Sequence, residues 1–121
     1  MMDWRNRLYE EYVVSGQAAG DGKAAFEQSS IATRRDGIQN TIRRFMPKEK
    51  GLRIVDLGCG HGDYVYHLNE RGYKDVQGVD VSKEQVELAH ELGVKNVVHD
   101  SILSYLQEQE PGSIDVVLLI D

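Results

Sequence analysis

The sequence predicts an α/β fold organised around a parallel sheet. Three observations lead to this prediction. Four short apolar runs follow one another between residues 53 and 120. A stretch with helical periodicity separates each run from the next, and this alternation is typical of parallel strands joined by right-handed crossovers. Glycines at 58, 60 and 62 directly follow the first run, which predicts a tight strand-to-helix turn.

The first 47 residues predict a helical lead-in. Residues 3 to about 15 have helical periodicity, residues 15–22 are rich in Gly, Ala and Ser and predict a linker, and residues 23–46 predict a second helix. Pro47 ends that helix, because the residue before a proline avoids the α conformation. The apolar face expected for the second helix is Ile31, Ile38, Ile42 and Phe45. We expect a boundary here, with residues 1–47 as a cap and 48–121 as the sheet-containing unit.

The first strand, residues 53–57, leads through the glycine turn into a helix over residues 63–71. Val65 and Leu68 face inward in that helix, and Gly72 is expected at C′. A second strand covers residues 75–80.

The next helix begins with a capping box formed by Ser82 and Gln85. In that motif the Ser82 hydroxyl accepts from the amide of residue 85, and Gln85 reaches back to the Ser82 amide. The helix ends at Gly93 and buries its apolar residues, Val86, Ala89 and Leu92.

A short third strand is expected at residues 96–99, a helix at 101–109 with apolar Ile102, Leu103 and Leu106, and a fourth strand at 114–120. The fourth run is apolar throughout, as in a strand covered on both faces. In a doubly wound sheet of order 3-2-1-4 this strand lies at an open edge. A long apolar edge is normally covered, so we expect a truncated sheet or self-association through this strand.

Composition narrows the function classes. The formal charge of −6 and pI near 5.2 argue against direct nucleic-acid binding. The single cysteine excludes an internal disulfide and suits the cytoplasm, no secretory signal is evident, and no run is long enough to span a membrane. No histidine pair has zinc-ligand spacing with supporting cysteines, so we assign no metal. His67 and His90 are expected at the surface, and His61 lies within the glycine turn.

The glycine turn carries the strongest functional signal. The dinucleotide fingerprint G-x-G-x-x-G needs a third glycine where this chain has Asp63 or Val65, so neither register fits. The spacing is instead G-x-G-x-G, preceded by Asp56 and Leu57. This stretch resembles the first motif of the class I S-adenosylmethionine (SAM)-dependent methyltransferases, D-L-G-C-G-x-G. The resemblance implies a Rossmann-like doubly wound sheet, SAM as cofactor and S-adenosylhomocysteine as product.

For the first strand and its turn, the resemblance implies a binding site for the methionine part of SAM. Its expected backbone contributors are Gly58, Cys59, Gly60 and Gly62. Asp56 corresponds to the residue that approaches the amino group of the ligand. Its alternative role is to cap local backbone amides.

The remaining site residues follow the later strands. By resemblance, Asp80 accepts from the ribose hydroxyls, and Val81 packs on the adenine face. Asp100 accepts from the adenine amino group, with backbone groups from Ser101 and Ile102 beside it. Asp100 or Ser101 equally suits an N-cap of the next helix. Asp121 corresponds to the methionine end of the pocket. Candidates for closing the pocket from the lead-in are Tyr9, Tyr12 and Arg34, each of which also suits ordinary packing or solvated charge.

The resemblance therefore implies methyl transfer from SAM to an O, N or C nucleophile, with a small molecule expected as acceptor. No catalytic residue is assigned, since none is identifiable before the end of the fourth strand. Two alternatives stay open. One is a non-catalytic SAM-binding or scaffold fragment, and the other a nicotinamide-dependent oxidoreductase, against which the glycine spacing speaks.

Overall fold

Four parallel strands form the centre of the fold. The computed structural model describes residues 23–120, with side chains from Arg34 onward. The strands are β1 (Arg53–Leu57), β2 (Asp75–Asp80), β3 (Val97–His99) and β4 (Val116–Leu118). Their order in the sheet is β3-β2-β1-β4, and every pairing is parallel, which confirms the predicted fold class and strand order.

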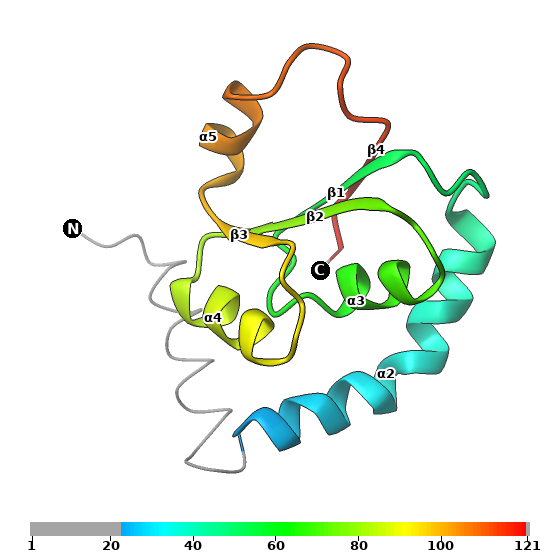
Figure 1. Cartoon of the computed structure of the whole chain (residues 1–121), viewed down its shortest axis with the longest axis vertical. Coiled ribbons are helices and arrows are strands. Elements are labelled where there is room, and N and C mark those ends of the chain that lie inside the picture. Colours follow the sequence, from blue (N-terminus) through cyan, green and yellow to red (C-terminus); the bar gives the residue numbers. More distant parts are fainter. Residues whose placement is uncertain (1–22, 121) are drawn as a thin grey trace.

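The helices alternate with the strands as expected. They are α2 (Lys23–Phe45), α3 (Asp63–Glu70), α4 (Lys83–Glu91) and α5 (Ile102–Gln107). Figure 1 shows α2, α3 and α4 on one side of the sheet and α5 on the other. The predicted helix at residues 3 to about 15 and the predicted linker at 15–22 lie outside the described residues. None of the described helices is long and apolar enough to cross a membrane.

Two apolar clusters lie on opposite faces of the sheet because side chains alternate along a strand. The larger cluster contains Ile54 and Val76 together with Val65 and Leu68 of α3. The smaller one contains Val55, Leu57 and Val79 and is closed by Tyr105 of α5. The second face is covered by a short helix only, so less of it is buried.

The lead-in helix belongs to the larger cluster. Ile38 and Ile42 of α2 are 3% and 1% exposed and pack in the same cluster as β1 and α3. Phe45, expected on this face, is 72% exposed, so that prediction was wrong. It lies at the helix end with the Arg44 guanidinium 5.3 Å from its ring, while Met46 packs against the cluster instead.

A polar contact between α2 and α3 overturns another expectation. His67 was expected at the surface, but it is 1% exposed. Gln39 of α2 places its side-chain nitrogen 3.2 Å from His67 Nδ1, and Arg71 donates to Gln39 Oε1 at 2.7 Å. The helical periodicity of α3 gave no sign of this, because burial of His67 depends on its tertiary neighbour α2.

The fourth strand lies at the sheet edge, as predicted, but it is shorter than the expected 114–120 and is not buried on both faces. Its register pairs Val117 with Val55, so Val117 and Leu119 point to the α5 side. There they are 46% and 75% exposed. Asp115, just before β4, has a structural role: its carboxylate accepts from the Arg53 amide at 2.8 Å.

Candidate functional site

The glycine turn lies at the carboxyl ends of the strands, where ligands bind in open α/β sheets. Gly58, Gly60 and Gly62 all have positive φ, at 81°, 61° and 89°. A residue with a side chain would be strained at each of these positions. Two backbone bonds tie the turn to β2, since the amides of Gly58 and Cys59 both donate to the Val79 carbonyl at 2.8 and 3.0 Å.

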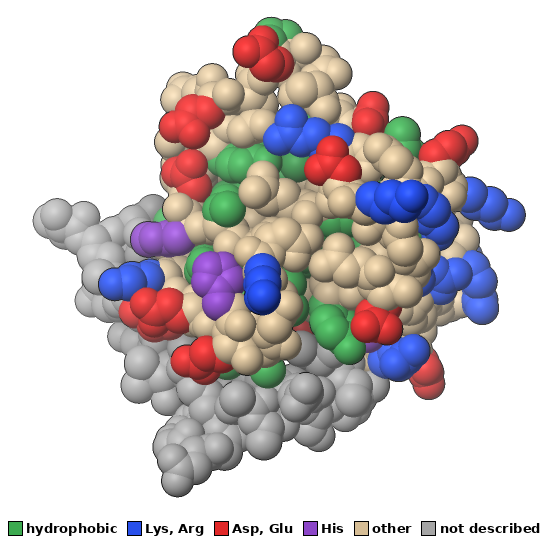
Figure 2. Space-filling view, in the orientation of Figure 1, with side chains coloured by type: hydrophobic (Ala, Val, Ile, Leu, Met, Phe, Trp, Pro, Cys, Tyr) green, Lys and Arg blue, Asp and Glu red, His purple; other side chains and the backbone are tan. Residues whose placement is uncertain are grey.

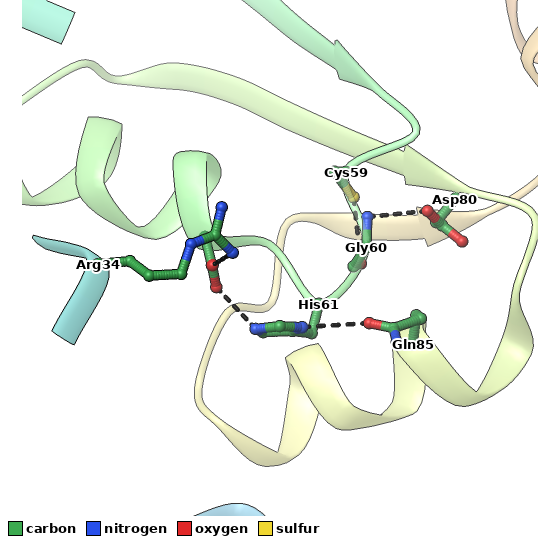
Figure 3. Close-up of polar contacts among 7 residues, drawn as sticks. Arg34, Cys59, Gly60, His61, Asp80 and Gln85 are labelled. Atoms are coloured by element: carbon green, nitrogen blue, oxygen red, sulfur yellow. Dashed lines mark hydrogen bonds and ion pairs between the residues drawn. The ribbon is translucent and has the colours of Figure 1, made fainter. Parts of the chain in front are cut away.

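Asp80 connects the loops that follow three neighbouring strands. Its side chain accepts from the amide of Gly60 at 2.8 Å (Figure 3). It also accepts from the amide of Ser82 at 2.8 Å. Its carbonyl accepts from the Asp100 amide at 3.1 Å. Asp80 is 3% exposed, so its carboxylate is held in place by buried backbone donors.

The Asp80 contacts correct one predicted bond. Ser82 does cap α4, accepting from the Gln85 amide as expected. The Gln85 side chain does not return to the Ser82 amide, because Asp80 already accepts from that amide. Gln85 instead places Oε1 3.2 Å from Nδ1 of His61. Only half of the predicted capping box is therefore formed.

Asp56 is the unusual group of the site. It lies near the end of β1 and is 3% exposed, and its Oδ1 is buried without a hydrogen-bond partner among the described residues. The local backbone capping considered as its alternative role is not seen at this oxygen. Burial, followed by the negative charges of Asp80 and Asp63, raises the pKa of Asp56 from 3.8 to about 7. A cationic group placed beside this oxygen would stabilise its ionised form.

The space around the glycines differs from one to the next. A Cβ added at Gly58 would meet nothing within 4 Å, whereas one at Gly60 would lie 3.5 Å from Gln85 Oε1. The face of the turn at Gly58 is therefore open to a ligand, and the Gly60 side is backed by α4. An amino-acid-like ligand would suit these two features: the open backbone at Gly58, and the Asp56 oxygen that has no partner among the described residues.

Asp63 and His61 lie in close contact at the start of α3. His61 Nε2 lies 2.7 Å from Asp63 Oδ1, and Arg34 of α2 contacts Asp63 Oδ2 at 2.5 Å. Burial alone would raise the pKa of Asp63, but the hydrogen bond and charge of His61, with the charges of Arg34 and His67, lower it. Arg34 therefore connects the lead-in helix to the turn.

The remaining predicted residues surround the β2 and β3 ends. Val81 is half-buried, and its carbonyl accepts from His99 Nε2 at 3.0 Å. Ser101, not Asp100, caps α5, since its hydroxyl accepts from the Ser104 amide. Asp100 accepts from the Ser101 amide at 2.8 Å, and Ile102 is 41% exposed. Asp121 lies outside the described residues.

Sequence reasoning missed three residues that shape the turn: Asp63, Gln85 and Gly78. A Cβ at Gly78 would lie 2.6 Å from Cys59 Sγ and 2.9 Å from Val65 Cγ2. A glycine inside a strand often marks such close approach, so Gly78 could have been found from the sequence. Asp63 and Gln85 could not, because their roles depend on contacts between elements. The residues from 23 to 120 contain no group of three or more His, Cys, Asp or Glu side chains arranged to hold a metal ion.

Comparison with known proteins decides the family. A family model described as a methyltransferase domain matches residues 48–121, more than half of the chain. The chain belongs to the class I SAM-dependent methyltransferases. This confirms the resemblance found in the glycine turn.

Individual methyltransferases resemble the chain over part of their length. The ribosomal protein L11 methyltransferase of Shewanella denitrificans is 30% identical over 67 residues, 55% of this chain and 23% of that protein. The ubiquinone biosynthesis O-methyltransferase of Neisseria meningitidis serogroup C is 33% identical over 79 residues, 60% of this chain and 32% of that protein.

A solved structure gives the same result. The crystal structure of a SAM-dependent methyltransferase from Archaeoglobus fulgidus has a TM-score of 0.57 at 30% identity, covering 69% of this chain and 37% of that one. The matched part of this chain thus spans between 23% and 37% of the length of these three relatives.

Proposed function

We propose that this methyltransferase-family chain binds SAM at the glycine turn and supplies the cofactor-binding part of a methyl-transfer enzyme. The observation that carries the proposal is the buried Oδ1 of Asp56, which has no hydrogen-bond partner among the described residues and lies beside an open backbone turn. The ammonium group of an amino acid would satisfy that oxygen, and the turn leaves room for its main chain. In this proposal residues 48–121 form the cofactor unit and residues 1–47 the cap, in the cytoplasm.

The proposed contacts follow the edge of the sheet. Asp56 pairs with the amino group of SAM, and the methionine part lies along the turn formed by Gly58, Cys59, Gly60 and Gly62. Asp80 accepts from the ribose; each of its oxygens has a second lone pair beyond the backbone bond that it already accepts. Val81, Asp100, Ser101 and Ile102 contact adenine, and Asp121 the methionine end.

SAM supplies a methyl carbon already activated by its sulfonium, so the protein acts mainly through positioning. Bound SAM would supply its methyl group for in-line transfer to the acceptor nucleophile and would leave as S-adenosylhomocysteine. Asp56 would hold the amino group of the cofactor and Asp80 its ribose, and the turn between them would fix the orientation of the methionine part. We assign no catalytic base.

For the acceptor we propose a small molecule with an O, N or C nucleophile. The Neisseria relative is named for ubiquinone biosynthesis, which supports this class. The Shewanella relative is named for a ribosomal protein, so a protein acceptor is the competing possibility. Methylation assays with extracts separated into small-molecule and protein fractions distinguish the two.

Calorimetry tests the cofactor assignment. S-adenosylhomocysteine should bind the chain and NAD should not. Asp80→Ala should weaken S-adenosylhomocysteine binding by about 1–3 kcal/mol through lost hydrogen bonds to a charged group. The exposed Asp36→Ala variant, on the outside of α2, is the matched control and should bind like the parent. Equal affinity of the parent and the Asp80 variant would overturn the assignment, and binding of NAD alone would favour an oxidoreductase.

One observation favours a second function, a non-catalytic scaffold that associates through β4. The strand is at the sheet edge with exposed apolar side chains on the α5 side. A chain that self-associates but does not bind S-adenosylhomocysteine would support this scaffold role in place of the enzyme.

A further inference from the structure

The ring of His61 lies between two helices at the back of the glycine turn. Nδ1 is 3.2 Å from Oε1 of Gln85 in α4, and Nε2 is 2.7 Å from Oδ1 of Asp63 in α3. Figure 3 shows the ring between the two partners, on the strand-to-helix turn that also carries Gly60. His61 thus joins the turn to both helices that follow it on this side of the sheet.

The backbone on either side of His61 does little to fix its own conformation. Gly60 and Gly62 flank it, both with positive φ, and glycine has the widest conformational freedom of any residue. Each residue held in one conformation costs about 1–2 kcal/mol of backbone entropy. A turn of this composition therefore needs contacts from outside to keep one shape.

The partners of His61 are themselves well held. Gln85 is 3% exposed, and its Oε1 also lies against the turn, 3.5 Å from the place that a Cβ on Gly60 would occupy. Asp63 is 5% exposed and is contacted from α2 by Arg34. The contacts thus run from the lead-in helix through Asp63 and His61 to α4, and they cross the turn at its centre.

Resting on the function proposed above, we propose that His61 is a positioning residue for the cofactor. It acts through Gln85 and Asp63 to keep the turn in its binding shape before the ligand arrives. Binding to a turn already in that shape avoids the entropy of ordering it, which increases affinity without a new contact to the ligand. Both ring nitrogens of His61 contact side chains of the two helices, Gln85 in α4 and Asp63 in α3.

The test compares His61→Ala, Gln85→Leu and the double variant in the full chain. S-adenosylhomocysteine binding should weaken about 5- to 20-fold in each single variant, the equivalent of one or two lost hydrogen bonds. The double variant should be no weaker than the worse single one, because both break the same connection. His61→Gln should recover part of the loss, and the exposed His90→Ala variant is the matched control. Additive losses would indicate direct ligand contact by His61 and overturn the proposal.

A second measurement needs no ligand. Amide hydrogen exchange of residues 58–62 should be faster in His61→Ala and in Gln85→Leu than in the parent, while exchange in β1 and β2 stays the same. Unchanged exchange in the turn would overturn the proposal. If the parent itself fails to bind S-adenosylhomocysteine, the proposed function fails, and the exchange data still decide the role of His61. If His61→Ala does not fold, Gln85→Leu carries the same comparison.

Discussion

Individual residues at the turn have unusual protonation behaviour because three carboxylates lie close together. Asp56, Asp63 and Asp80 are each no more than 5% exposed, yet they are stabilised differently. Asp63 has the Arg34 guanidinium beside it and Asp80 has backbone donors, whereas Asp56 Oδ1 has no hydrogen-bond partner in the part of the chain that the structure describes. Asp56 also raises the pKa of the neighbouring Cys59 thiol, in addition to the larger effect of burial, so this cysteine is not an activated nucleophile.

Asp56 should make stability depend on pH. Because the pKa of Asp56 rises from 3.8 to about 7 on folding, protonated Asp56 adds to the free energy of unfolding. This contribution is full below pH 4 and is lost as the pH rises toward 7. Asp56→Asn cannot ionise, so its stability advantage over the parent should grow across that range, by up to about 4 kcal/mol for a shift of this size. Thermal melting by circular dichroism at pH 4 to 8 measures this difference in stability between the variant and the parent. Asp36→Asn, at an exposed site, serves as control, and a constant difference for Asp56→Asn would contradict the shift.

The same group should make cofactor binding depend on pH. A cationic amino group requires the ionised carboxylate, so S-adenosylhomocysteine affinity should fall as the pH drops below about 7, by up to tenfold per unit. Calorimetry between pH 5.5 and 8 tests this expectation. In Asp56→Asn the overall affinity should be lower and this pH dependence should disappear. A parent affinity that is flat across the range would argue against the proposed contact.

The elements themselves could largely be predicted from the sequence. The glycines that follow the helices, together with helical periodicity, predicted the bounds of α3 and α4 to within one or two residues, because both signals are local. The errors have tertiary causes. The Gln85 side chain bonds to His61 in place of its own helix terminus. Among the described strands β4 pairs with β1 only, so its outer edge has no neighbouring strand there. His67 is buried because α2 covers it.

Two glycines in different elements should respond oppositely to the same substitution. Gly78→Ala in β2 should destabilise the protein by about 1–3 kcal/mol, since the new Cβ would overlap Cys59 Sγ and Val65 Cγ2. Gly37→Ala in α2, where a Cβ meets nothing within 4 Å, should stabilise by about 0.5–1 kcal/mol through helix propensity. Urea unfolding of both variants gives the comparison. A neutral Gly78→Ala would show that Cys59 can move aside.

For the molecule as a whole, the two faces of the sheet are covered unequally. Of the helices that the structure describes, α2, α3 and α4 pack on the face of the larger cluster, and α5 packs on the other. Apolar side chains are visible around α5 in the space-filling view (Figure 2). Those most exposed on this side are Leu103, Val117 and Leu119, at 69%, 46% and 75%. The site at the strand ends could be predicted from local motifs, but this imbalance depends on the assembled sheet.

The exposed edge should make the 121-residue chain self-associate as its concentration rises. Val117→Lys places a charge on the edge strand and should shift the population toward monomer. Sedimentation velocity measures the shift, and Glu91→Lys, at an exposed position at the end of α4, controls for the change in net charge. A parent chain that stays monomeric at every concentration would count against association through β4.

The packing of Ile38 and Ile42 has a practical consequence for protein engineering. The match to known methyltransferases starts at residue 48, which makes that position an attractive place to trim the gene. A product cut there would lose two isoleucines that are almost completely shielded from water, together with the arginine that neutralises Asp63. The region that matches the family model is therefore shorter than the region that forms the apolar core, and the longer version is the one to express.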